Sequence, residues 1–106
     1  MIIKLTSRAV DQLKQKINSN MIALKYDFDG CGCVVSGVTH LEEISQIEEG
    51  YEVASNEQND FTIVFQKQYE WVYDEMMTID FLEEANTFLL KSDNQIFNPR
   101  MMIKKV

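Results

Sequence analysis

The fold class can be predicted from one segment, Ile22-Ala23-Leu24-Lys25-Tyr26-Asp27-Phe28. Its large apolar residues occupy every second position, and the residues between them are small or charged. This period of two is typical of a half-buried β-strand, because successive side chains of a strand point to opposite faces. Asp29-Gly30 then predicts a turn, and Cys33–Thr39 predicts a second strand. The middle of the chain is therefore expected to be β-structure.

One amphipathic helix is predicted before this segment. Thr6-Ser7 offers a hydroxyl that can cap the first free backbone amides of a helix. Asn18-Ser19-Asn20 is expected to end it. Four apolar residues recur at helical spacing and are expected to form the buried stripe of this helix: Ala9, Val10, Leu13 and Ile17.

Short strands are expected to follow in the rest of the chain, at Tyr51–Ala54, Phe61–Phe65, Met77–Phe81 and Thr87–Lys91. Gln68–Asp74 is crowded with aromatic residues and predicts a short helical turn, whereas Glu42–Glu49 is polar and ambiguous. Asn98 precedes Pro99 and is expected to be extended. One helix before about six short strands predicts a mostly β domain with an N-terminal α-helix, folded as an antiparallel β-sandwich or pseudo-barrel. A chain of 106 residues suits one domain over residues 1–106.

Charge and composition exclude several classes of function. The net charge is −7, and the segment 26–66 holds nine of the 17 carboxylates without a Lys or Arg. This distribution argues against nucleic-acid binding, since phosphate contacts need clustered cations.

No apolar run approaches the roughly 20 residues of a membrane span, and the apolar start of the chain is too short for a signal peptide. We expect a cytoplasmic protein whose acidic surface is solvated or attracts a cation or a basic partner.

Cys31 and Cys33 are the only cysteines and are separated by one glycine. On an extended backbone, residues two apart project to the same face, so both sulfurs could reach one ion. Thiolates favour zinc, copper(I) and iron–sulfur clusters, which want about four ligands. A two-fold dimer would supply four thiolates, and His40 is a further candidate ligand. The alternatives are two idle thiols at a turn and a surface histidine.

Other polar and aromatic residues are expected to have structural roles. Glu42 and Glu43 are expected to face solvent, as are the pairs Asp74-Glu75 and Glu83-Glu84, because no nucleophile motif or histidine accompanies those pairs. The aromatic residues Tyr69, Trp71 and Tyr73 are expected to pack in the core with the phenylalanines. We therefore expect no enzyme.

The chain resembles the HesB-like, or A-type, iron–sulfur biosynthesis family over nearly its whole length. Ile3–Val10 resembles the strand and capped helix that open the family, and Leu24–Cys33 resembles the strand leading into its Gly-Cys-Ser-Gly motif. Met77–Phe81 resembles a later strand with the pattern x-Leu-Asp-Phe. Asn98-Pro99 falls in a similar tail.

The resemblance implies a HesB-like fold, self-association, and binding of iron or an iron–sulfur cluster for delivery to recipient apoproteins or assembly machinery. The family binds through three cysteines, of which only the first carries over, onto Cys31. The tail Ile96–Val106 has no cysteine, and Cys33 stands where the motif ends in glycine. The leading hypothesis is an iron–sulfur assembly or carrier protein that uses Cys31 and Cys33 across a dimer. Its rivals are an interaction or regulatory protein that has lost cluster binding and a dithiol redox protein.

Overall fold

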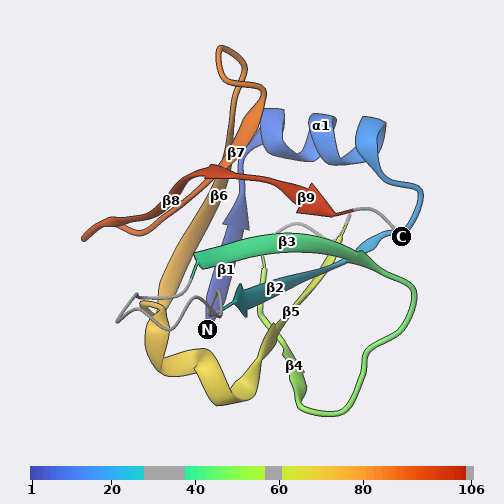
Figure 1. Ribbon diagram of the computed structural model, residues 1–106, viewed down its shortest axis with the longest axis vertical. Coiled ribbons are helices and arrows are strands. Elements are labelled where there is room, and N and C mark those ends of the chain that lie inside the picture. Colours follow the sequence, from blue (N-terminus) through green and yellow to red (C-terminus); the bar gives the residue numbers. More distant parts are fainter. Residues whose placement is uncertain (28–37, 57–60, 105–106) are drawn as a thin grey trace.

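The computed structural model describes residues 1–27, 38–56 and 61–104. These residues form one α-helix, one 3-10 helix and short strands (Figure 1). In chain order the elements are β1 (Ile2–Leu5), α1 (Ser7–Lys16), β2 (Met21–Asp27), β3 (Val38–Ile44), β4 (Tyr51–Val53), β5 (Thr62–Gln66), η1 (Lys67–Val72), β6 (Met76–Leu82), β7 (Thr87–Lys91), β8 (Ile96–Met101) and β9 (Ile103–Lys104). The prediction of a mostly β chain with one N-terminal helix is confirmed.

The strands make two sheets that join at two places. One sheet has the order β1-β6-β7-β8 and the other β4-β5-β2-β3-β9. Ile2 bridges to Ser55, which connects β1 to the region between β4 and β5. At the other junction β8 continues through Met102, whose carbonyl accepts a hydrogen bond from the Leu41 amide of β3 at 3.0 Å. These two junctions connect the two sheets within one mostly β fold.

The prediction of an antiparallel arrangement is only partly right. The pairs β2–β3, β4–β5, β6–β7 and β7–β8 are antiparallel, but β1–β6, β2–β5 and β3–β9 are parallel. Each parallel pair joins strands far apart in the sequence. A local pattern of alternation fixes which residues are buried, not which distant strand becomes the neighbour.

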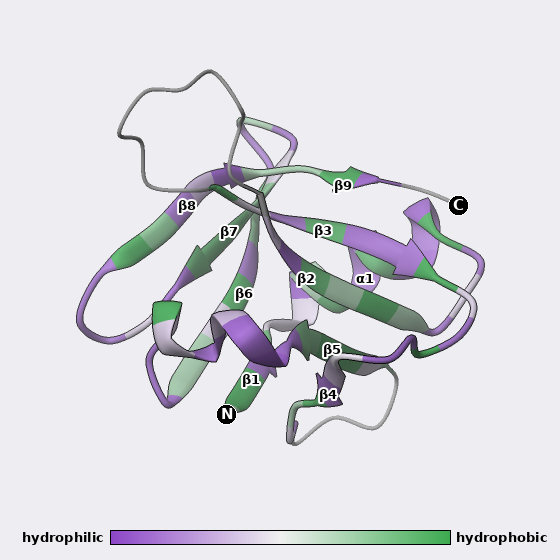
Figure 2. Cartoon of the chain, turned by 60° about the horizontal axis from the view of Figure 1, so that its bottom comes forward, coloured by the Kyte–Doolittle hydropathy of each residue, from purple (hydrophilic) through white to green (hydrophobic). Residues whose placement is uncertain are grey.

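The helix forms as its sequence predicts. The Thr6 hydroxyl accepts a hydrogen bond from the Ala9 amide at 3.3 Å and so caps α1. The predicted stripe is buried, and its residues pack in one core with large side chains from both sheets. In Figure 2 hydrophobic residues dominate β1 and β5, whereas η1 is largely hydrophilic. The core members that are fully buried and largest are Phe65, Phe81, Phe88, Ile3, Leu13, Ile22, Leu24, Leu41, Ile63, Met77, Ile79 and Leu90.

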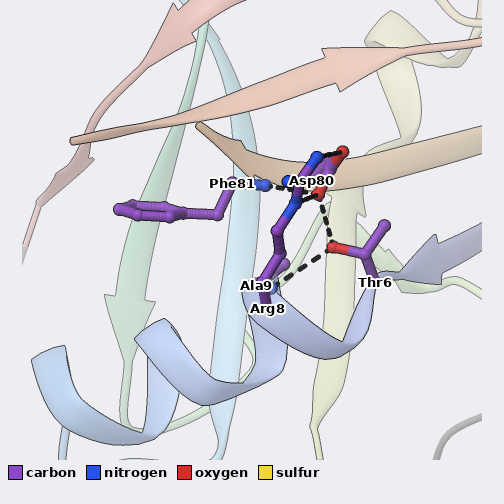
Figure 3. A network of polar contacts seen from close by, with 5 residues as sticks. All are labelled: Thr6, Arg8, Ala9, Asp80 and Phe81. Atoms are coloured by element: carbon purple, nitrogen blue, oxygen red, sulfur yellow. Dashed lines mark hydrogen bonds and ion pairs between the residues drawn. The ribbon is translucent and has the colours of Figure 1, made fainter. Parts of the chain in front are cut away.

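A charged cluster fixes the start of α1 to β6 (Figure 3). The Asp80 carboxylate accepts hydrogen bonds from the Thr6 hydroxyl at 2.6 Å, from two Arg8 nitrogens at 2.8 Å and from the Phe81 amide at 2.8 Å. The Arg8 guanidinium holds the pKa of Asp80 far below its usual range, with further help from Thr6 and the Phe81 amide, although burial opposes the shift. Asp80 therefore has a structural role inside the segment that resembles the family's x-Leu-Asp-Phe strand.

Several elements differ from the predictions. The second predicted strand, Cys33–Thr39, lies largely outside the described residues. The strand β3 instead continues through Ile44, into the polar stretch Glu42–Glu49. The helical turn predicted for Gln68–Asp74 is confirmed by η1. The strands β8 and β9 were not predicted, since Pro99 and the polar residues of the tail obscure their alternation.

Among the described residues, no helix is long and apolar enough to span a membrane.

Candidate functional site

The predicted ligands Cys31 and Cys33 belong to the connection between β2 and β3. These strands are antiparallel neighbours, and the last pair in their register is Asp27 with Val38. The ten residues between this pair, 28–37, lie outside the described residues, and both cysteines are among them. We call the paired ends of the two strands, around Asp27 of β2 and Val38 of β3, the base of the cysteine segment.

One side of this base is held by a neutral hydrogen-bond network. The hydroxyls of Thr39 and Tyr73 are 2.9 Å apart and share a buried hydrogen bond. The Asn98 side chain of β8 donates to the Thr39 carbonyl at 2.7 Å, and the rings of Tyr73 and Phe97 lie 6.0 Å apart. Burial raises the pKa of Tyr73 to about 12, although the bond to Thr39 opposes the shift. Tyr73 therefore stays a neutral phenol at physiological pH.

The other side of the base involves Tyr26. Its amide donates to the Gln66 side-chain oxygen of β5 at 2.8 Å, and its ring lies 5.2 Å from that of Tyr69 in η1. The two strands entering and leaving the cysteine segment are thus attached to β5, η1 and β8. The base of the site is fixed by contacts with elements from three other parts of the chain.

His40, the third predicted ligand, lies on the outward face of β3. Its register partner is Lys25 of β2, and its Nε2 atom is 3.6 Å from a Glu42 carboxylate oxygen. The Lys25 ammonium is 3.3 Å from Glu42 and 5.9 Å from the centre of the Tyr51 ring. Burial alone would lower the pKa of Lys25, but Tyr51 and Glu42 outweigh burial and raise it. His40 thus lies beside the ion pair of Lys25 and Glu42.

Two expectations about which side chains are exposed are wrong. Glu43 is buried, with 7% of its surface exposed, because its carboxylate accepts hydrogen bonds from the Asn18 and Ser19 amides at 2.9 and 2.8 Å. It closes the end of the connection from α1 to β2. Trp71 was expected in the core but is 73% exposed. Trp71 lies in η1, none of whose residues is buried.

The other carboxylate pairs do not assemble into a metal or acid–base centre. Glu83 and Glu84 are exposed in the turn between β6 and β7. Asp74 accepts hydrogen bonds from the Ser92 hydroxyl and the Asn94 side chain and so ties the β7–β8 turn to the start of β6. No group of three or more His, Cys, Asp or Glu residues that could hold a metal occurs within 1–27, 38–56 and 61–104. Thr39 and Tyr73 were missed as site residues, since only the pairing of β3 brings them together.

A family model for iron–sulphur cluster biosynthesis matches residues 1–105. The chain belongs to this family. A curated relative from Bacillus subtilis, the "Uncharacterized protein YqkB", is 36% identical over 109 residues, which cover 97% of each chain. The family assignment therefore confirms the resemblance found in the sequence and extends over both cysteines and the base described above.

Solved structures share the fold. A "putative Fe-S biosynthesis protein" from Lactobacillus acidophilus aligns with a TM-score of 0.78 at 24% identity, covering 99% of this chain and 90% of the other. A second such protein, from Lactobacillus salivarius, gives 0.78 at 20% identity, with 99% and 98% coverage. Escherichia coli SufA, involved in biosynthesis of iron–sulfur clusters, gives 0.58 at 14% identity, with 84% and 81% coverage. At these identities the likeness establishes the fold.

Proposed function

We propose that this protein is an iron–sulfur assembly or carrier protein that holds iron or an iron–sulfur cluster as cargo through Cys31 and Cys33. The observation that carries the proposal is the position of the only two cysteines, between two paired strands of an iron–sulphur biosynthesis fold. The role is binding and transfer to recipient apoproteins or assembly machinery, not catalysis. A reducing cytoplasm would keep both thiols available.

The base of the cysteine segment supports this role. Asp27 and Val38 are register partners, so the segment leaves and re-enters the sheet at one place. The network of Thr39, Tyr73 and Asn98 holds that place without a charged group. Neutral anchors neither repel a bound cation nor compete with it for a thiolate. A fixed base suits a pair of ligands that must accept and release cargo.

The ligand count favours two chains. Common clusters and tetrahedral metal sites want about four protein ligands, and each chain has two cysteines. A two-fold dimer would bring two such pairs together, since the interface of a two-fold dimer meets itself. The alternative third ligand, His40, already has its Nε2 atom 3.6 Å from the Glu42 carboxylate, which makes it the weaker choice. We therefore propose a homodimer with its cargo shared between the cysteine pairs, zinc being the competing metal.

The test is anaerobic purification followed by iron, sulfide and zinc analysis and absorption spectroscopy. Wild-type protein is compared with Cys31→Ser, Cys33→Ser, the double variant and His40→Asn. The proposal predicts thiolate-to-iron charge-transfer bands that are lost in the double variant and kept in His40→Asn. Bands of equal intensity in the wild type and the double variant, or no metal after reconstitution, would contradict it.

A second candidate function is favoured by the composition of the tail. The segment 96–106 contains no cysteine, whereas the resemblance implies two family ligands near this end. This observation supports an interaction or regulatory protein that kept the fold and lost cluster binding. That function predicts a metal-free protein whose melting temperature is indifferent to chelators, unlike a domain whose metal contributes to folding.

A further inference from the structure

A hollow of about 340 Å³ lies beside the exposed Trp71, where the end of η1 meets the start of β6 and the beginning of the chain. Its lining residues are Met1, Glu70, Trp71, Tyr73, Asp74 and Glu75. Three of these residues are apolar or aromatic and three are acidic, and none is Lys or Arg.

Hydrogen bonds fix the backbone around this hollow and one of its three carboxylates. The Glu70 carbonyl accepts a hydrogen bond from the Tyr73 amide at 3.1 Å, which closes η1, and the Glu75 carbonyl accepts one from the Ile2 amide at 2.8 Å. One Asp74 carboxylate oxygen accepts from the Ser92 hydroxyl at 2.5 Å and from the Asn94 side chain at 3.3 Å. The backbone of the rim and the Asp74 carboxylate are thus fixed before a ligand binds, which reduces the entropy lost on binding.

The charge on this rim is not neutralised by the rest of the fold. Within the part of the chain that the structure describes, neither Glu70 nor Glu75 forms an ion pair. A tryptophan that is 73% exposed beside such a rim offers a flat π-face to a cation. Among protein cations, the arginine guanidinium both stacks on an aromatic ring and bonds a carboxylate with two parallel N–H groups. Tryptophan and arginine are also the residues most enriched at interface hot spots.

From these observations we propose that the hollow beside Trp71 is a docking site for an arginine side chain on an exposed segment of a partner protein. The guanidinium would stack on Trp71 and be bound by the carboxylates of Glu70 and Glu75, with Asp74 as a fixed acceptor. The Tyr73 ring lines the hollow and its hydroxyl bonds Thr39 at the base of the cysteine segment. Tyr73 therefore connects the hollow to that base. Docking requires no metal and does not depend on the cargo proposed above.

Trp71 is the only tryptophan of the chain, so its fluorescence reports on this hollow alone. The probe is the peptide acetyl-Gly-Arg-Gly-Arg-Gly-amide, titrated into the metal-free full-length protein at low salt. Its control is the same peptide with citrulline in place of arginine, because citrulline keeps the shape and loses the charge. The arginine peptide is expected to change the Trp71 emission saturably and to bind at least about fivefold more tightly than the citrulline peptide.

Matched variants locate the site. Glu70→Gln with Glu75→Gln is expected to weaken arginine-peptide binding at least about fivefold. Glu83→Gln with Glu84→Gln removes the same charge from the β6–β7 turn and is expected to leave binding within about twofold. The Cys31→Ser, Cys33→Ser double variant is expected to bind as the wild type does, which separates this proposal from cluster binding. Equal binding of the two peptides, no saturable response, or equal losses in the two glutamate pairs would overturn the proposal.

Discussion

Two polar clusters hold this fold together, and they differ in charge. At the start of α1, Asp80 gathers Thr6 and Arg8 in an ionic cluster. At the base of the cysteine segment, Thr39, Tyr73 and Asn98 make neutral hydrogen bonds. Both clusters join segments that are distant in sequence. The difference is that the first cluster is ionic, whereas the second joins its segments through neutral groups alone.

Asp80→Ala is expected to give the largest loss of stability. It leaves the Thr6 hydroxyl, the Arg8 guanidinium and the Phe81 amide without their shared acceptor, and breaking such a network costs about 2–4 kcal/mol of unfolding free energy. Urea denaturation at pH 7 measures the change. Asp93→Ala, in the exposed β7–β8 turn, is the control and is expected to cost less than about 0.5 kcal/mol. Equal losses in the two variants would remove the distinction between the clusters.

The ionic cluster is also expected to be sensitive to acid. Folding lowers the pKa of Asp80 below its ordinary value of 3.8, so the unfolded chain takes up its proton first as the pH falls. The stabilisation by Asp80 is therefore complete above about pH 4 and declines below it. Unfolding free energies at pH 7 and pH 3 are expected to fall more in the wild type than in Asp80→Asn. An identical fall in both would show that other carboxylates carry the acid sensitivity.

Substitutions in the neutral cluster are expected to cost less unfolding free energy than Asp80→Ala. Tyr73→Phe removes one hydroxyl and leaves that of Thr39 buried without its partner, which costs about 1–2 kcal/mol. Thr39→Val combined with Tyr73→Phe removes both hydroxyls and is expected to recover part of the loss. Thermal and urea unfolding measure the double variant and both single variants, Tyr73→Phe and Thr39→Val. A double variant that loses the sum of both single changes would contradict the shared bond.

A substitution on the outward face of β2 and β3 is expected to have the smallest effect on the unfolding free energy. Glu42 is paired with Lys25 at 3.3 Å, and both side chains are partly exposed, at 25% and 29%. Such pairs contribute little, so Glu42→Gln is expected to change the unfolding free energy by less than about 0.5 kcal/mol and to depend weakly on salt. A loss as large as that of Tyr73→Phe would mean that a surface pair anchors the site as firmly as the neutral network does.

The local parts of this fold could be predicted from the sequence. The cap at Thr6, the buried stripe ending at Ile17 and the strands around Phe65 and Phe81 follow from neighbouring residues. The parallel pairing of β1 with β6 could not be predicted, because alternation within a strand carries no information about a distant partner. The burial of Glu43 depends in the same way on amides 24 and 25 residues away.

From the sequence, the candidate site could be predicted only as its two cysteines, without the residues that anchor the neighbouring strands. The run Gly30–Cys33 indicated soft-metal chemistry, and the resemblance indicated the family. The anchors Tyr73 and Asn98 could not be found, since both reach Thr39 only after β3 has paired. The exposure of Trp71 was hidden for a related reason. An aromatic cluster in a sequence resembles core packing unless the turn that directs each ring is known.

Native mass spectrometry of anaerobically reconstituted protein tests the central claim most directly, because it counts chains and cargo in one particle. The account predicts a particle of two chains that carries one iron–sulfur cluster, and predicts its absence in the Cys31→Ser, Cys33→Ser double variant with the fold intact by circular dichroism. Single chains without iron in the wild type, or a cluster that persists in the double variant, would contradict a cargo site built from Cys31 and Cys33.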